Sequence, residues 1–122
     1  MNKLFHNDML QCVLALINYE NRRESMQKYI VNSPELTDFV NVIKLLAHPI
    51  RFSIALSLKD NGVLNVSKIQ ESLDLTQSTV SQHISKLREA GIVSAERDGT
   101  KIFYSLTSDT AKLVLDAYSQ YK

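Results

Sequence analysis

The sequence predicts a mainly α-helical fold with one small β-hairpin, and three observations support this fold class. Apolar residues recur at helical spacing in several segments, for example Val80, Ile84 and Leu87. Two runs of strand type, IVSAER and TKIFYSLT, flank Asp98-Gly99, which is a strong hairpin signal. The chain has 122 residues, 44% of them hydrophobic, which suits one globular domain small enough to benefit from dimerisation.

Composition narrows the class of protein further. Charges interrupt the apolar runs well short of the roughly 20 residues that a membrane helix requires, and the N-terminus lacks the pattern of a signal peptide. We therefore expect a cytoplasmic protein with no membrane partner.

Cys12 is the single cysteine, so it forms no internal disulfide and builds no zinc or iron–sulfur site by itself. Its apolar surroundings favour an inert buried thiol, and a redox role for Cys12 stays open as the alternative.

Residues 1–33 are expected to form a helical extension to a main domain at residues 34–122. Apolar residues at helical spacing lie between Leu10 and Ile17, and a second apolar group from Met26 to Ile30 follows a polar patch. This pattern predicts one long helix or two short ones over residues 7–30. We expect the extension to serve dimerisation.

Two helices are predicted at the start of the main domain. The first begins after Ser33 as N-cap, with Pro34 in the first turn, where its missing N–H costs nothing. The residue before a proline is pushed out of the helical region, so His48, which precedes Pro49, marks a boundary. The second helix runs to the turn signal Asn61-Gly62. The apolar face of the first helix consists of Leu36, Phe39, Val40, Ile43 and Leu46.

A short helix, a tight turn and a longer helix come next. Asn65 caps the segment VSKIQESL, and only DLT separates this segment from a helix expected at residues 77–90. Thr76 is placed as the N-cap of the longer helix, and Gly91 as the left-handed residue after its last turn. Its apolar stripe can dock on a core, so we expect it to be half buried.

The hairpin and a last helix complete the domain. Basic residues, Arg97 and Lys101, flank the Asp98-Gly99 tip of the hairpin. The last helix is expected at about Asp109 to Tyr121. Its apolar face is formed by Leu113, Val114, Ala117 and Tyr118. A domain of this size does not cover that face alone, so the helix is expected to dimerise.

The helix at residues 77–90 carries short polar side chains that are poor helix formers. They are Gln77, Ser78, Thr79, Ser81, Gln82 and Ser85. The major groove of B-DNA is about 12 Å wide and admits one helix, and its base edges are contacted by short or flexible donors and acceptors. Lys86 can reach backbone phosphates, and Arg97 and Lys101 can contact neighbouring backbone or the minor groove. A helix-turn-helix followed by a hairpin with a charged tip is the winged-helix arrangement, which predicts a partner of double-stranded DNA.

The near-neutral overall charge does not by itself argue for or against DNA binding, and it gives some support to a rival function. The net charge is +1, from 14 basic and 13 acidic residues, which is not the strongly basic balance typical of nucleic-acid binding. The alternative is a protein-interaction module with incidental DNA affinity. An enzyme is less favoured than either, because the sequence has no paired carboxylates, nucleophile–base set or phosphate-binding glycine loop. We therefore expect no cofactor.

Two blocks of the sequence, VIKLLAHPIRFSIALSL and LTQSTVSQHISKLREAGIVSAERDGTKIFYSL, resemble the ArsR/SmtB family of bacterial winged-helix repressors. The resemblance covers about residues 38–118. It implies a homodimer that binds an operator of pseudo-two-fold symmetry and represses transcription, commonly until an inducer releases it. The resemblance places the base-reading segment on Gln77, Ser78, Thr79, Ser81 and Gln82, and the wing tip on residues 97–101.

The chain departs from the metal-sensing members of that family. Those members carry Cys-Val-Cys where this sequence has Asn65-Val66-Ser67, and an amide and a hydroxyl do not replace thiolates as ligands for soft metals. Asp109 and Asp116 stand on the last helix without the histidines of the zinc-sensing members. A weaker alternative is a site for a metal ion formed by His6, Asp8 and Cys12. We therefore expect a regulator without the usual metal site, whose inducer and operator the sequence does not identify.

Overall fold

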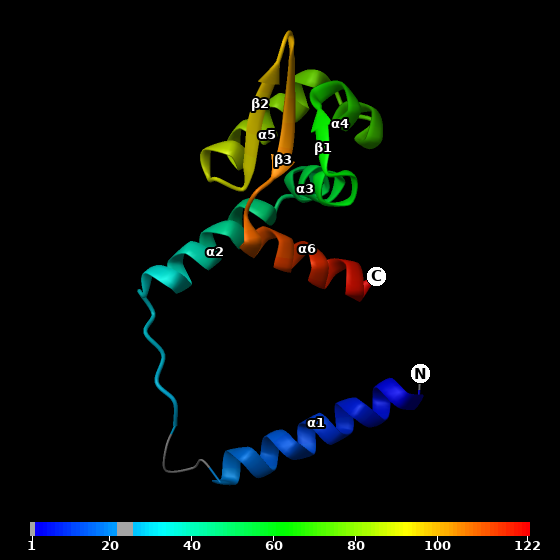
Figure 1. Ribbon diagram of the computed structural model, residues 1–122. Coiled ribbons are helices and arrows are strands. Elements are labelled where there is room, and N and C mark those ends of the chain that lie inside the picture. Colours follow the sequence, from blue (N-terminus) through cyan, green and yellow to red (C-terminus); the bar gives the residue numbers. More distant parts are fainter. Residues whose placement is uncertain (1, 22–25) are drawn as a thin grey trace. The chain divides into compact units, whose positions relative to one another are not determined.

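The computed structural model describes residues 2–21 and 26–122 (Figure 1). The chain divides into two compact units, Met1–Val31 and Asn32–Lys122. In chain order, the elements are α1 (Asn2–Asn21), α2 (Pro34–Leu46), α3 (Pro49–Asn61), β1 (Val63–Asn65), α4 (Val66–Leu73), α5 (Gln77–Glu89), β2 (Val93–Asp98), β3 (Lys101–Leu106) and α6 (Asp109–Tyr121). The predicted class, mainly helical with a small hairpin, is confirmed.

The first unit contains α1, which starts earlier and ends sooner than the sequence pattern suggested. The helix ends at Asn21, and residues 26–30 are not helical, so the expectation of helix in that second segment is wrong. A segment of so few residues does not form a stable helix in water without packing support. Cys12 is exposed rather than buried, because α1 is the only helix described in this unit and has nothing there to pack against.

Helices α2 and α3 meet at the predicted break. The Ser33 Oγ accepts a hydrogen bond from the Leu36 N–H at 3.2 Å, and the His48 Nδ1 accepts one from the Ile50 N–H at 3.2 Å. Both helices therefore begin with a side-chain cap followed by proline. The cap at Ser33 and the boundary at His48 were predicted from the sequence, whereas the capping role of the His48 side chain was not. No single helix in the described part of the chain is long and apolar enough to cross a membrane, and α2 and α3 meet that criterion only together, across a bend of 101°.

The helix-turn-helix is formed by α4 and α5, and its local signals are confirmed. The Asn65 Oδ1 accepts from the Lys68 N–H at 2.9 Å at the start of α4. Asp74 ends α4 with a φ of 53°, a left-handed conformation that aspartate tolerates better than most residues. Gly91 follows α5 with a φ of 75°. The helix ends at Glu89, one residue before the expected end, because Ala90 takes the capping position.

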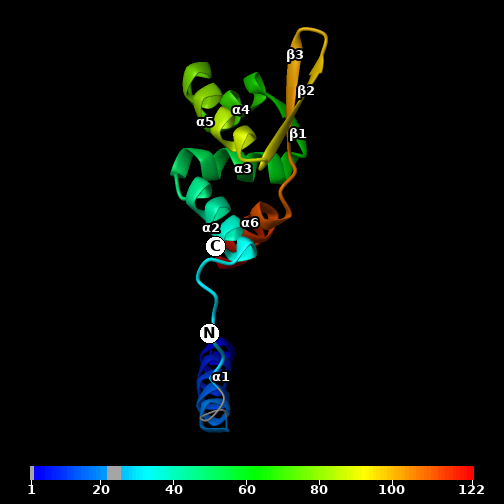
Figure 2. The same cartoon turned by 90° about the vertical axis from the view of Figure 1, so that its left-hand side faces the viewer.

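The predicted hairpin is present, but it belongs to a sheet of three strands. Pairing runs from Val93 opposite Leu106 to Asp98 opposite Lys101, and β1 adds to the other edge of β3 in the order β1-β3-β2. Strand β1 was not predicted, because three residues are too few to show an alternating pattern. Both views show the hairpin projecting from the end of the second unit that lies away from α2 and α6 (Figure 1; Figure 2).

One apolar core holds the second unit together. The stripe on α5 is confirmed, since Val80 and Leu87 are fully buried and Ile84 is 2% exposed. The other members of the core are Leu46, Ile54, Ala55, Leu58, Ile69, Ile92, Val93, Tyr104, Leu106, Ala111 and Leu115. No polar or charged residue is buried among the described side chains. Hydrophobic burial is therefore the main source of stability.

The apolar faces of α2 and α6 are only partly used inside the unit. Of the predicted face on α2 only Leu46 is buried, and the remaining members are 41–43% exposed. Helix α6 contacts the core through Ala111 and Leu115, whereas Leu113 is 65% exposed and Tyr118 is 39% exposed. The two helices thus leave apolar side chains in contact with solvent.

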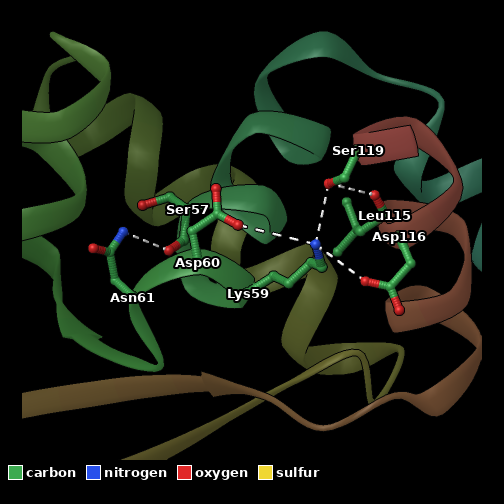
Figure 3. Close-up of polar contacts among 7 residues, drawn as sticks. All are labelled: Ser57, Lys59, Asp60, Asn61, Leu115, Asp116 and Ser119. Carbon is green, nitrogen blue, oxygen red and sulfur yellow. Dashed lines mark hydrogen bonds and ion pairs between the residues drawn. The ribbon is translucent and has the colours of Figure 1, made fainter. Parts of the chain in front are cut away.

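A polar cluster around Lys59 joins α3 to α6 (Figure 3). The Lys59 Nζ lies 3.1 Å from the Asp116 Oδ1 and 4.0 Å from the Asp60 Oδ1, and it donates to the Ser119 Oγ at 3.1 Å. The Ser119 hydroxyl in turn donates to the Leu115 carbonyl at 3.2 Å. Asp116, which the sequence analysis considered at a metal-ligand position, is therefore engaged in an ion pair.

Candidate nucleic-acid interface

The first turn of α5 is stabilised by two threonines. The Thr76 Oγ1 accepts from the Thr79 N–H at 3.2 Å, and the two hydroxyl oxygens lie 2.9 Å apart. Thr79 is half buried, unlike the exposed residues Gln77 and Ser78 before it. Its hydroxyl is therefore part of the N-terminal cap and is less accessible to an external partner than the other polar groups of this helix.

The polar side chains of α5 divide between an outward face and a flank. With 3.6 residues per turn, Ser78, Gln82 and Ser85 lie opposite the buried stripe, and all three are exposed. Gln77 and the half-buried Ser81 lie one turn apart on a flank between that face and the core. These residues were predicted to share one surface, whereas in the structure they point in two directions.

The basic residues of the wing also point in two directions. Arg97 and Lys101 are both exposed. Arg97 is the cross-strand partner of Ile102, and Asp98 is the partner of Lys101. Because partners share a face and neighbours along a strand alternate, Arg97 and Lys101 leave the hairpin on opposite sides. They do not form one basic patch.

Lys86 is exposed near the C-terminal end of α5. A contact between two histidines, which was not predicted from the sequence, involves the same helix. The rings of His48 and His83 lie 4.5 Å apart between centroids, and they join the start of α3 to the middle of α5. The His83 Nδ1 is buried and lacks a hydrogen-bond partner among the described residues. Burial lowers the pKa of His83, and the charges of His48, Arg51 and Lys86 lower it further.

Metal-ligating groups do not cluster in the described part of the chain. No group of three or more histidine, cysteine, aspartate or glutamate residues is placed there to hold a metal ion. Asn65, at the usual thiolate position, serves as the cap of α4. The side chain of His6 lies outside the described residues, so the alternative site with Asp8 and Cys12 falls partly outside them. The exposure of Cys12 satisfies one requirement of a redox-active thiol, since oxidation depends on access as well as on thiolate character.

Similarity to characterised proteins agrees with this geometry. A family model described as "Bacterial regulatory protein, arsR family" matches residues 48–95, which include the helix-turn-helix. The biofilm growth-associated repressor of Agrobacterium fabrum is 40% identical over 81 residues, which cover 66% of this chain and 68% of that protein.

Two solved structures extend the similarity to the fold. The transcriptional repressor PagR of Bacillus anthracis superposes with a TM-score of 0.64 at 34% identity, covering 69% of this chain and 95% of that one. The transcriptional repressor BigR of Xylella fastidiosa superposes with a TM-score of 0.66 at 32% identity, covering 70% of this chain and 86% of that one.

These similarities confirm the family that the sequence motifs indicated. They identify a winged helix-turn-helix regulator of transcription rather than an enzyme. The protein belongs to the ArsR family of DNA-binding bacterial regulators.

Proposed function

We propose that this protein is a homodimeric repressor that binds a pseudo-two-fold operator in double-stranded DNA. The observation that carries this proposal is the polar face of α5, where Ser78, Gln82 and Ser85 are exposed opposite a fully buried apolar stripe. A helix of this kind fits the major groove, where glutamine can bond adenine through two hydrogen bonds. The repressors of Agrobacterium fabrum, Bacillus anthracis and Xylella fastidiosa support the direction of regulation.

The proposed DNA-contacting residues come from α5 and the wing. They are Gln77, Ser78, Thr79, Ser81, Gln82, Lys86, Arg97 and Lys101. Exposure supports most of this set, and Thr79 is its weakest member because its hydroxyl interacts with Thr76. Lys86, Arg97 and Lys101 supply positive charge for phosphates, which contributes affinity without sequence preference.

The dimer is proposed to form through α2 and α6. These helices expose Phe39 and Ile43 on one and Leu113 and Tyr118 on the other, and a two-fold axis lets one apolar patch cover its copy. We further propose that α1, whose apolar residues from Leu10 to Ile17 are exposed, enlarges this interface by packing against the partner's last helix.

Equilibrium binding to DNA tests the proposed function. Fluorescence anisotropy would compare the duplex upstream of the protein's own gene with a scrambled duplex at two salt concentrations. We expect a dissociation constant of about 10⁻⁸ M or tighter for the operator, at least about a thousandfold below that of the scrambled duplex, with both affinities falling as salt rises. Gln82→Ala should reduce this preference. Asn61→Ala, an amide-to-alanine change at an exposed residue of α3 outside α5, the wing and the proposed dimer interface, is the matched control. Equal and weak binding to every duplex, including those selected from a random pool, would favour the protein-interaction alternative.

Sedimentation velocity tests the dimer separately. Leu113→Glu should convert the dimer to a folded monomer, because it places a charge in an apolar interface. Val63→Glu makes the same type of change at a residue that is 59% exposed on β1, outside the proposed interface, and should leave the dimer intact. Equal sedimentation of the two variants with the wild type would refute the assignment of α6.

A further inference from the structure

A polar pocket lies where the wing meets the first turns of α4 and α5. Its volume is about 230 Å³, and its polar lining comes from Asn65, Ser67, Gln77, Thr100 and Lys101. These residues belong to three separate parts of the unit that the fold brings together, since 35 positions along the chain separate Asn65 from Thr100.

The end of β1 creates the space for this pocket. The last pair between β1 and β3 joins Asn65 to Phe103, and α4 begins at the next residue. Residues 100–102 therefore have no strand beside them on that edge of β3. The pocket is lined by residues of this uncovered edge and by Gln77 of α5.

The chemistry of the lining selects an anion. Each polar side chain there can donate hydrogen bonds, through an amide, a hydroxyl or an ammonium group, and no carboxylate lines the pocket. The Asn65 Oδ1 is already occupied by the Lys68 N–H, which leaves its amide hydrogens for a ligand. Asp98, the cross-strand partner of Lys101, is not among the lining residues.

We propose that this pocket receives one phosphate of the operator backbone, and that Gln77 positions α5 through this phosphate instead of reading a base. The proposal rests on the proposed DNA-binding function and assigns different roles to different polar residues of α5. Ser78 and Gln82 face outward toward the groove, whereas Gln77 faces the wing side, where Lys101 supplies the positive charge. A contact to phosphate fixes register and orientation but carries no sequence information.

Affinity measurements on matched glutamine variants separate the two roles. Gln77→Ala and Thr100→Ala should each weaken binding to the selected operator and to a scrambled duplex by about tenfold, as expected for a hydrogen bond to a charged group, and should leave the ratio of the two affinities within about twofold. Gln82→Ala should lower the operator affinity alone, by about fivefold or more. Lys101→Ala should reduce the slope of log affinity against log salt by about one. Far-UV circular dichroism and urea midpoints check that each variant is folded.

A scan with single neutral methylphosphonate linkages then locates the phosphate. One linkage in each half-site should abolish the penalties of both Gln77→Ala and Thr100→Ala, because the two side chains share one charged partner. The proposal is overturned if Gln77→Ala changes the operator preference by more than about fivefold, or if no single linkage removes both penalties. A wild-type protein that binds no duplex would overturn the proposed function itself, and this result is visible before any variant is compared.

Discussion

Truncation of Leu87 to alanine is expected to lower the free energy of unfolding by about 3 kcal/mol. Leu87 is fully buried and belongs to the stripe that attaches α5 to the core. The three carbon atoms removed contribute about 0.8 kcal/mol each through transfer from water, and the remaining cavity adds on the order of 1 kcal/mol. A domain of about 100 residues has a total stability of only about 5–15 kcal/mol, so the change is a large fraction of it.

Urea unfolding followed by far-UV circular dichroism measures this loss. The comparison has to be made at one protein concentration, because dimerisation adds to the apparent stability. Ser85→Ala is the matched control, since Ser85 is exposed on the same helix, and its unfolding free energy should change by no more than about 0.5 kcal/mol. The melting temperature of the Leu87 variant should fall by roughly 12–24 °C. A loss below about 1 kcal/mol for Leu87→Ala would refute the inference that this stripe anchors the DNA-facing helix.

Three further predictions follow from local contacts. Thr76→Ala should cost about 1 kcal/mol in urea unfolding because it removes the cap of α5, whereas an unchanged midpoint would contradict that role. Asp116→Asn should cost less than about 1 kcal/mol, because its pair with Lys59 is partly exposed, and the difference should shrink in high salt. Burial holds the pKa of His83 below its usual value of 6.5, so the unfolded chain binds a proton there more readily. Stability should therefore be fully present above pH 6.5 and fall as the pH drops below it, and His83→Asn should flatten this decline between pH 7 and 5.

Local sequence signals were sufficient to predict the secondary structure of the second unit and the family. The caps at Ser33, Asn65 and Thr76 and the turn at Asp98-Gly99 each depend on side chains within a few residues of the backbone groups that they satisfy. Such signals are complete in the linear sequence, so the order and type of most elements could be predicted. The same is true of the apolar stripe on α5, which follows from helical spacing alone.

The way in which those elements face one another depends on packing between distant parts of the chain. The strand β1 exists because Val63 to Asn65 pair with a segment about 40 positions away, and no local pattern announces that pairing. The pocket that Gln77 shares with the wing depends on how α4, α5 and β3 pack together, and the ion pair of Lys59 with Asp116 depends on how α3 crosses α6. These features arise from packing between distant segments, where burial and shape select one arrangement among several that the local sequence permits equally well.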